Sequence, residues 1–276
     1  GDKEFERVKA IKLFVDEQNK RNVGKQAKKI PEIPMDLRMD YVLANFASYM
    51  AMDKMVVGLD YASVQPTVLD LSKGGIITIS GQKEKGRELF SKMFLNAFAN
   101  GQFGDAELYI MDNMTRALAN FEFNQSTAIY TNTVDCVSSM FDEIDQRITS
   151  RYEMISSGNT LENEPWICIA IESSDAIEEI SNNSKVMGIV KNLIGKYKQM
   201  KVFLVLTDVE NNNIPYGAPE LLKLVKDNKK YFIFEDIGAI KLCDISISLT
   251  RKYAKPIDMC DAYYINDVDL IKIKTV

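Results

Sequence analysis

The sequence predicts an α/β fold with a mainly parallel sheet flanked by helices. From residue 76 onward, short apolar or β-branched runs alternate with longer segments of helical periodicity, which is typical of βαβ units around a parallel sheet. Most of these runs are almost continuously apolar, as strands covered on both faces are. The chain has 276 residues, 46% of them apolar and 26% charged, which is typical of soluble globular proteins. We expect one large domain or two small ones.

The N-terminal part of the chain predicts a helix followed by a linker. Residues 2–20 place apolar side chains at helical spacing among many charges, which indicates an amphipathic helix with one narrow apolar stripe. Residues 22–34 hold a glycine, several lysines and two prolines, so they cannot continue that helix. We therefore divide the chain into a linker helix and connector, 1–54, and a folded domain, 55–276. The first residue is glycine and not methionine, which suggests an expressed fragment with a cleavage scar.

The domain is predicted to begin with a small β hairpin, formed by residues 55–60 and 67–71 on either side of a turn. The last segment, 262–273, partly alternates apolar and polar residues and is predicted to end as an edge strand. Buried strands are expected over 76–79, 108–111, 127–130, 166–171, 202–207 and 231–234. Helices are expected over 86–100, 134–155, 184–200 and 219–228.

Composition excludes several classes of function. The chain has no histidine, which removes Ser-His-Asp, Cys-His and histidine-metal mechanisms, and we predict no metal site. The net charge of -5 makes nucleic acid an unfavourable partner, because duplex binding needs a dense stripe of Lys and Arg. The four cysteines have no C-x-x-C spacing and are expected to be reduced packing residues. The sequence has no run of 18 apolar residues, so we expect no membrane insertion of this chain.

Residues 76–88 have the layout of a phosphate-binding loop, in which a buried strand leads through a Gly-x-x-x-x-Gly turn into a helix. The glycine spacing alone is weak support, and the strand-loop-helix context makes it informative. The candidate nucleotide-binding residues are Gly81, Gln82, Lys83, Glu84, Lys85, Gly86, Arg87 and Glu88.

This loop departs from the active pattern at its last two positions. A working loop ends in Gly-Lys-Ser/Thr, whose ammonium contacts the phosphates and whose hydroxyl holds Mg²⁺, and here those positions are Arg87 and Glu88. A carboxylate at 88 would repel phosphates, since two like charges 4 Å apart cost about 4 kcal/mol at an effective dielectric near 20. That cost predicts binding on the order of a thousandfold weaker. The backbone N–H groups and the helix dipole are still expected to attract anions, so weak binding of a nucleotide with Mg²⁺, or of another anion, stays open.

A second motif is altered at the matching place. The apolar run 166–171 resembles a Walker B strand, which ends in an Asp that helps to hold Mg²⁺ and a Glu that polarises the attacking water. Here Glu172 takes the metal position and Ser173 the base position, and a serine of ordinary pKa cannot act as that base. Glu172 is the one candidate catalytic residue. The alternative is a core strand with a polar end.

Other polar residues at strand ends have two interpretations each. Asp112-Asn113 and Asp208 follow strands at the edge where α/β sites form, but turn residues are the more common role for such positions. Arg147 and Arg151 lie four residues apart on a helix, where they either face solvent or act across a subunit boundary. Intrahelical pairing of Arg147 with Asp142-Glu143 fits the solvent-facing interpretation.

Two helices carry apolar residues that either pack on the sheet or line a groove for a peptide partner. Core packing is the default interpretation for both. The residues are Val186, Ile189, Val190, Leu193 and Ile194 in the first helix and Leu221, Leu222, Leu224 and Val225 in the second.

A family resemblance follows from two stretches in order, residues 57–60 and then residues 69–81, Leu-Asp-Leu-Ser-Lys-Gly-Gly-Ile-Ile-Thr-Ile-Ser-Gly. They resemble the approach to the phosphate loop in FtsK/SpoIIIE-type P-loop ATPases. More narrowly, the chain is similar to the C-terminal (third) ATPase domain of the type VII secretion coupling protein EssC/EccC. The resemblance covers residue 55 to the end, and the preceding helix and linker resemble the connector from the ATPase domain before it.

The resemblance implies a RecA-like core in a membrane-anchored parent protein, on the cytoplasmic side of the membrane. It also implies contacts with preceding ATPase domains, hexamers of the full-length protein, and export of WXG100-type substrates. In this family the last domain recognises substrates and its nucleotide motifs are often degenerate, which Arg87, Glu88 and Ser173 match. We therefore expect substrate recognition with weak or absent nucleotide binding and little or no hydrolysis.

Two other functions stay open at this point. The first is a slow Mg-ATPase in which Lys83 or Lys85 replaces the missing lysine and Glu172 serves the metal or the water. The second, less favoured because of the acidic balance, is a DNA translocase.

Overall fold

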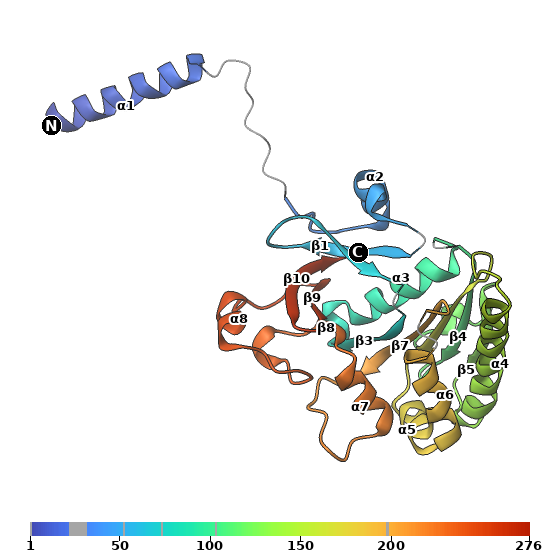
Figure 1. Ribbon diagram of the computed structural model, residues 1–276. Helices are drawn as coiled ribbons and strands as arrows, with labels where there is room; N and C mark the ends of the chain where they lie inside the picture. Colours follow the sequence, from blue (N-terminus) through green and yellow to red (C-terminus); the bar gives the residue numbers. More distant parts are fainter. Residues whose placement is uncertain (1, 22–31, 52, 73, 103, 197–198) are drawn as a thin grey trace. The chain divides into compact units, whose positions relative to one another are not determined.

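The computed structural model describes residues 2–21 and 32–276, apart from residues 52, 73, 103, 197 and 198 (Figure 1). The chain separates into two compact units, Gly1–Glu32 and Ile33–Val276. The first unit contains helix α1 (Asp2–Arg21), which confirms the predicted helix and leaves Val8, Ile11 and Phe14 more than half exposed. Most of the predicted linker, 22–31, lies outside the described residues. Within the described ranges, no helix combines the length and the apolar character needed to cross a membrane.

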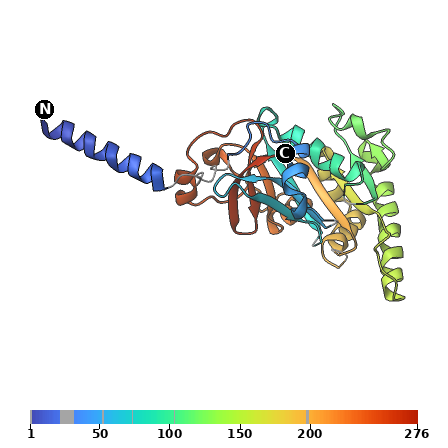
Figure 2. The same ribbon diagram turned by 90° about the horizontal axis from the view of Figure 1, so that it is seen from above.

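The second unit is built on one mixed sheet with the strand order β2-β1-β10-β9-β8-β3-β7-β6-β4-β5 (Figures 1 and 2). From β8 to β5 all neighbours are parallel, whereas the strands from β2 to β8 pair antiparallel. The strands are β1 (Lys54–Asp60), β2 (Pro66–Asp70), β3 (Gly75–Gly81), β4 (Ala106–Met111), β5 (Thr127–Thr131), β6 (Trp166–Ile171), β7 (Val202–Val209), β8 (Lys230–Phe234), β9 (Asp261–Asn266) and β10 (Asp269–Thr275). The six predicted strands and the N-terminal hairpin are confirmed, but β5 is an edge strand that is only partly buried, so its predicted burial is wrong.

Helices cover both faces of this sheet and produce a three-layer α/β structure. Their bounds are α2 (Met39–Phe46), α3 (Arg87–Ala99), α4 (Val137–Ser156), α5 (Ser174–Asn182), α6 (Ser184–Ile194), α7 (Glu220–Asp227) and α8 (Ile247–Lys252). The sequence did not predict α2, α5 or α8. The predicted helix 184–200 ends six residues early, because Gly195 leaves the helical conformation with φ -102° and ψ -86°.

One face of the sheet packs against α3. Phe90, Phe94 and Phe98 recur at spacings of four residues, so they share one side of the helix and are fully buried against the strands. Phe90 contacts Phe232 and Phe234 of β8 with ring centroids 4.8 and 5.5 Å apart. These aromatic contacts fix the start of α3 beside the end of β3.

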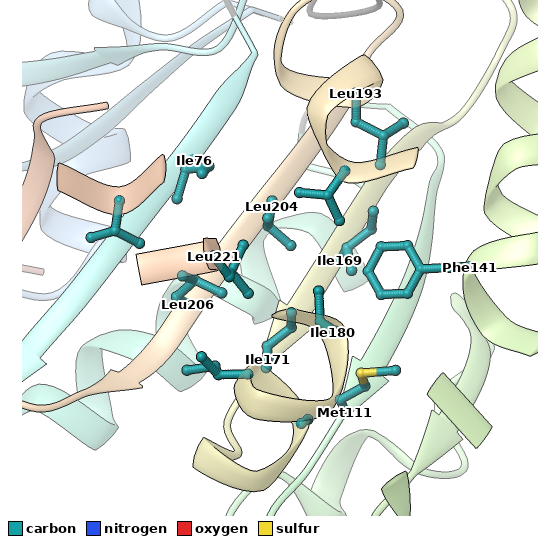
Figure 3. Close-up of a cluster of buried hydrophobic side chains, with 14 of the residues drawn as sticks. Ile76, Met111, Phe141, Ile169, Ile171, Ile180, Leu193, Leu204, Leu206 and Leu221 are labelled. Atoms are coloured by element: carbon teal, nitrogen blue, oxygen red, sulfur yellow. The ribbon is translucent and has the colours of Figure 1, made fainter. Parts of the chain in front are cut away.

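The other face packs against α4, α5, α6 and α7. Figure 3 shows the cluster, in which Phe141, Ile180, Leu193 and Leu221 from the four helices meet the strands of the parallel half. The strand side chains labelled there are Ile76, Met111, Ile169, Ile171, Leu204 and Leu206. Because both faces of these strands are covered, their near-continuous apolar sequence is explained.

The predicted edge strand at the C-terminus is wrong. The last segment forms the hairpin of β9 and β10, and β10 lies inside the sheet between β9 and β1, while β2 and β5 are the edges. Its polar positions are accommodated by Asp261 of β9, which accepts Tyr61 Oη at 2.6 Å and pairs with Lys272 Nζ at 2.8 Å and Lys274 Nζ at 3.4 Å. A sequence with alternating lysines can therefore occupy a central strand, since a buried carboxylate compensates their charge.

Candidate functional site

The loop between β3 and α3 has a backbone that only glycine permits at two positions. Gly81 and Gly86 have φ of +107° and +103°, in the left-handed region. A Cβ at Gly81 would lie 2.4 Å from the Phe234 carbonyl oxygen of β8, too close for any side chain. The predicted Gly-x-x-x-x-Gly turn therefore exists, with residues Lys83–Lys85 as a single 3₁₀ turn between the glycines.

Neighbouring segments hold this loop in place. The Gln82 backbone N–H donates to the Phe234 carbonyl at 2.8 Å, and Gln82 Nε2 donates to Glu235 Oε1 at 2.6 Å. On the other side, the Cys260 N–H donates to the Lys85 carbonyl at 2.8 Å. Side chains and backbone from β8 and from the turn before β9 thus fix the loop from both ends.

Two loop amides form hydrogen bonds within the loop. The N–H of Lys85 donates to the Gln82 carbonyl at 3.2 Å, and the N–H of Gly86 donates to the Lys83 carbonyl at 2.9 Å. In a phosphate loop the backbone N–H groups point together at the anion. Here at least two of those donors serve the 3₁₀ turn.

Arg87, the first residue of α3, extends into the sheet and not toward solvent. Its side chain is 4% exposed, and one guanidinium nitrogen, Nη1, lies among three oxygens. It donates to the carbonyl oxygen of Thr207, lies 3.0 Å from Asp208 Oδ1, and lies 3.6 Å from Glu172 Oε1. The strands β3, β7 and β6 are adjacent, so the guanidinium joins the carboxyl ends of all three.

Glu172, the candidate catalytic residue, is buried behind Arg87. Its side chain is 3% exposed, and Oε1 has no hydrogen-bond partner within the described residues. Burial raises the pKa of the Glu172 carboxyl, and the opposing influence of the Thr207 hydroxyl and of Arg87 is smaller. Ser173 has a structural role, because its hydroxyl accepts the Ala176 N–H at 3.2 Å and caps the N-terminus of α5.

The sequence predicts that the charge of Glu88 repels phosphates. In the structure, cations lie beside this charge. Its carboxylate accepts Lys92 Nζ at 2.6 Å, one turn along α3, and lies 3.8 Å from Lys83 Nζ. The hydrogen bond from Lys92 is the main cause that lowers the pKa of Glu88. Lys85, the other lysine considered as a replacement, donates to the Ile257 carbonyl at 2.7 Å. Of the two candidate substitutes for the missing lysine, Lys85 is thus hydrogen-bonded to the protein, whereas Lys83 is 51% exposed and only lies near Glu88.

Asp112 and Asp208, the two aspartates at strand ends, have different roles. Asp112 is buried and accepts the N–H of Leu118 at 2.8 Å and the hydroxyl of Tyr130 at 2.7 Å, so it organises the loop after β4, as a turn residue does. Asp208 lies inside β7 and pairs with Arg87, so the turn role expected for it is wrong. Its position at the end of an apolar run was the signal available in the sequence, and the adjacency of β7 to β3 comes from the structure.

The two arginines of α4 are also placed differently from the expectation. Arg147 Nε donates to Glu107 Oε2 of β4 at 3.1 Å, and not to the acidic pair one turn before it. Arg151 is 1% exposed and donates to the carbonyl oxygens of Met200 and Pro165 at 2.8 and 2.6 Å. The solvent-facing interpretation is therefore wrong for Arg151, which connects α4 to the loops before β6 and β7.

The apolar residues of the helices 184–194 and 220–227 pack in the core, which confirms the default interpretation. A pocket of about 550 Å³, which the sequence did not indicate, lies instead beside the antiparallel half of the sheet. Its apolar lining includes Ile214, Leu242, Ile245, Leu249, Ile265 and Leu270, and lysines and aspartates also line it. Within the described part of the chain, no group of three or more metal-ligating side chains is found.

Comparisons with known proteins identify the fold. No protein-family model and no curated protein matches the chain. Among solved structures, EssC (ATPases 2 and 3) from Geobacillus thermodenitrificans aligns with a TM-score of 0.74 and 18% identity over 97% of this chain and 50% of that chain. The chain has the fold of the EssC/EccC ATPase domains. The cytoplasmic domain of EssC gives a TM-score of 0.73 with 17% identity over 97% of this chain and 52% of that one.

A third structure in this group was solved with a bound peptide. Thermomonospora curvata EccC (ATPases 2 and 3), in complex with a signal sequence peptide, aligns with a TM-score of 0.65 and 12% identity over 91% of this chain and 45% of that chain. The present chain thus spans about half the length of the EssC and EccC ATPase-pair structures that it matches. The predicted α/β P-loop ATPase fold is confirmed.

Proposed function

We propose that this chain is an ATPase-type domain of a type VII secretion coupling protein of the EssC/EccC kind, and that it recognises export substrates without turning over ATP. In this proposal it is the third domain of a membrane-anchored parent and lies on the cytoplasmic side of the membrane. It would contact the preceding ATPase domains within hexamers. Its substrates would be WXG100-type proteins. The fold likeness to EssC and EccC supports this context.

The pocket beside the antiparallel half of the sheet is the observation that carries the recognition role. Its volume of about 550 Å³ falls within the range of ligand sites, roughly 300 to 1,000 Å³. Ile265 and Leu270, from the β9-β10 hairpin, contribute to its apolar lining. Ile245, just before α8, and Leu249, within α8, contribute as well. Burial of apolar side chains of a peptide in this pocket would lower the free energy of the complex.

Hydrogen bonds position the segments that surround this pocket. Asn211 Oδ1 accepts the N–H of Lys241 at 2.8 Å, and Asn211 Nδ2 donates to the Ala239 carbonyl at 3.0 Å. The segment after β7 is thereby joined to the segment before α8. A pocket whose walls are fixed before binding loses less conformational entropy when a peptide enters.

The charges at the pocket suit a peptide with apolar and acidic residues. Lys226, Lys229 and Lys241 line it together with Asp244 and Asp267, which leaves one excess positive charge. The related EccC structure was solved with a signal sequence peptide, which supports a peptide as the ligand.

The loop site supports the absence of turnover. Glu172 is buried and faces Arg87, and the next residue caps a helix, so neither is free to activate a water molecule. Of the two lysines that a slow ATPase could use, Lys85 donates to the Ile257 carbonyl, and Lys83 is half exposed, 3.8 Å from Glu88. The geometry therefore favours recognition over the alternative of a slow Mg-ATPase.

The test is a titration of the 276-residue protein with a fluorescently labelled signal-sequence peptide from a WXG100-type protein of the same organism. We expect saturable binding that becomes at least about tenfold weaker in Leu249→Asp, because a carboxylate would be placed in the apolar wall. Ile247→Asp is the matched control, since Ile247 lies in the same helix, is 71% exposed and does not line the pocket. Absence of binding to the peptide and to the intact WXG100-type protein, or equal loss in both variants, would contradict the proposal.

A further inference from the structure

We infer that Arg87 takes the place of a divalent cation in this site, and that it is the residue that determines whether the site accepts a metal and its phosphates. This inference concerns the loop alone and does not depend on what the pocket binds. It differs from the explanation that the sequence offered, in which Glu88 repels phosphates.

The first support is the set of oxygens around one nitrogen. Arg87 Nη1 donates to the Thr207 carbonyl, and carboxylate oxygens of Asp208 and Glu172 lie 3.0 and 3.6 Å away. Backbone carbonyl and carboxylate oxygens are the ligands that hard divalent cations take in proteins. One positive charge thus lies where three such oxygens converge from two adjacent strand ends.

The second support is the place of this cluster in the fold. It lies at the carboxyl ends of β6 and β7, beside β3, and ligands of parallel α/β sheets bind at this edge. In an active phosphate loop, the metal is held between the hydroxyl after the lysine and the acidic end of the Walker B strand. Glu172 is that acidic end, and the guanidinium already contacts it.

The third support is burial. The side chains of Arg87 and Glu172 are 4% and 3% exposed, so neither can move to solvent without opening the packed start of α3. A metal that entered would have to displace the guanidinium and leave a buried cation without its partners, which is costly. The loop amides of Lys85 and Gly86 are engaged as well, so phosphate would also lack part of its cradle.

Glu88 is a weaker determinant than Arg87. Its carboxylate is 32% exposed and is paired with Lys92 and Lys83. Because the side chain is partly exposed, solvent screens its charge, and removing that charge changes the potential at Glu172 and Asp208 little. Replacing Glu88 alone should therefore not create a metal site.

The experiment uses Mn²⁺ as the probe and the variant Arg87→Gln, which removes the charge but retains a polar side chain. We expect Arg87→Gln to bind Mn²⁺ at least about tenfold more tightly than the wild type in a paramagnetic-resonance titration, because two carboxylates lose their counter-cation. About 1 mM Mn²⁺ should raise the melting temperature of this variant by a few degrees, and that of the wild type by less. Glu88→Gln is the matched control and should bind Mn²⁺ as the wild type does.

Two further variants keep the test decisive. Arg87→Gln with Glu172→Gln should lose the gained Mn²⁺ affinity, and Arg87→Lys, which keeps the charge, should not acquire it. If Arg87→Gln alone does not fold, recovery of folding in the double variant supports the inference, since it removes the uncompensated carboxylate, and failure of both overturns it. The inference is also overturned if the wild type binds Mn²⁺ as tightly as Arg87→Gln, or if Glu88→Gln shows the same gain.

Discussion

The loop site and the pocket lie in different halves of one sheet, and they differ in what fills them. At the ends of β3, β6 and β7, in the parallel half, the Arg87 guanidinium lies among oxygens of Glu172, Thr207 and Asp208, and two loop amides donate to carbonyls of the same loop. Beside β8, β9 and β10, in the antiparallel half, about 550 Å³ is lined by apolar side chains with lysines and aspartates. Under our proposal, one α/β fold loses its usual site at the strand ends and offers a second place for a partner.

Buried charges exist in both halves, and the balance of charges separates them. In the loop site the buried Arg87 faces two carboxyl groups, the buried Glu172 and Asp208, whose side chain is 41% exposed. In the antiparallel half one carboxylate, Asp261, faces Lys272 and Lys274. In each cluster one central side chain contacts two side chains of the opposite type, so removal of that central residue should be the most damaging change in each.

Arg87→Met should produce the largest effect. Breaking a buried ion pair from one side costs about 3–5 kcal/mol, and we expect a loss of about 4 kcal/mol in the free energy of unfolding, measured with urea. Arg116→Met is the control, since Arg116 pairs with Glu122 at the surface and should change the urea midpoint little. Equal losses in the two variants would remove the distinction between this cluster and an ordinary surface pair.

Asp261→Asn should lower the free energy of unfolding somewhat less, by about 3 kcal/mol at pH 7. The reason is that Tyr61 and the two lysines can still donate hydrogen bonds to the amide oxygen of the asparagine. Burial opposes ionisation of Asp261, but hydrogen bonds from Lys272, Tyr61 and the Asp258 backbone outweigh it and hold its pKa below the ordinary value. The stabilisation is therefore present above about pH 4 and is lost as the pH falls through the lowered pKa. Urea unfolding at pH 7 and at acid pH should show the difference between variant and wild type shrinking, and a constant difference would contradict this account.

Glu172→Gln should show the opposite dependence on pH. Burial raises the pKa of Glu172, so its contribution to stability is fully present at acid pH and is lost as the pH rises through the raised pKa. As the pH rises through this pKa, the free energy of unfolding of the variant should increase relative to that of the wild type. Urea midpoints measured in steps from acid to neutral pH test this, and a variant that loses ground as the pH rises would show that Glu172 is stabilised as an anion.

Glu88→Gln should produce the smallest effect, about 0.5 kcal/mol or less, because its ion pairs with Lys92 and Lys83 are partly exposed. It should also leave nucleotide affinity unchanged. Titration of a fluorescent ATP analogue with wild type and variant measures this affinity. Clear binding by Glu88→Gln alone would support the sequence-based explanation, in which the Glu88 carboxylate repels phosphates.

Much of the fold could be predicted because the parallel half follows simple rules. Continuous apolar runs such as 166–171 and 202–207 are buried on both faces, and the structure places them as neighbouring strands β6 and β7. The C-terminal hairpin could not be predicted in the same way. Lys272 and Lys274 are typical of an exposed edge, and only the pairing with Asp261 of the adjacent strand explains them.

The sequence predicts the loop conformation but not the contacts of its side chains. The loop pattern and the strand ends single out residues 81–88 and Glu172 as candidates, and the structure brings Arg87 and Glu172 together. The direction of the Arg87 side chain depends on the Thr207 carbonyl and on Asp208, which are 120 and 121 residues away in sequence. The pocket left no local signal, because its walls come from the segments after β7, before β9 and at the β9-β10 turn.

The claim that Arg87 already fills the cation position can be tested most directly by calorimetry of the wild-type chain with Mg-ATPγS. Up to about 2 mM ligand, we predict no saturable heat, since metal and phosphate would have to displace a buried, paired guanidinium. Saturable binding with a dissociation constant below about 100 µM, requiring Mg²⁺ and lost in Glu172→Gln, would contradict the account.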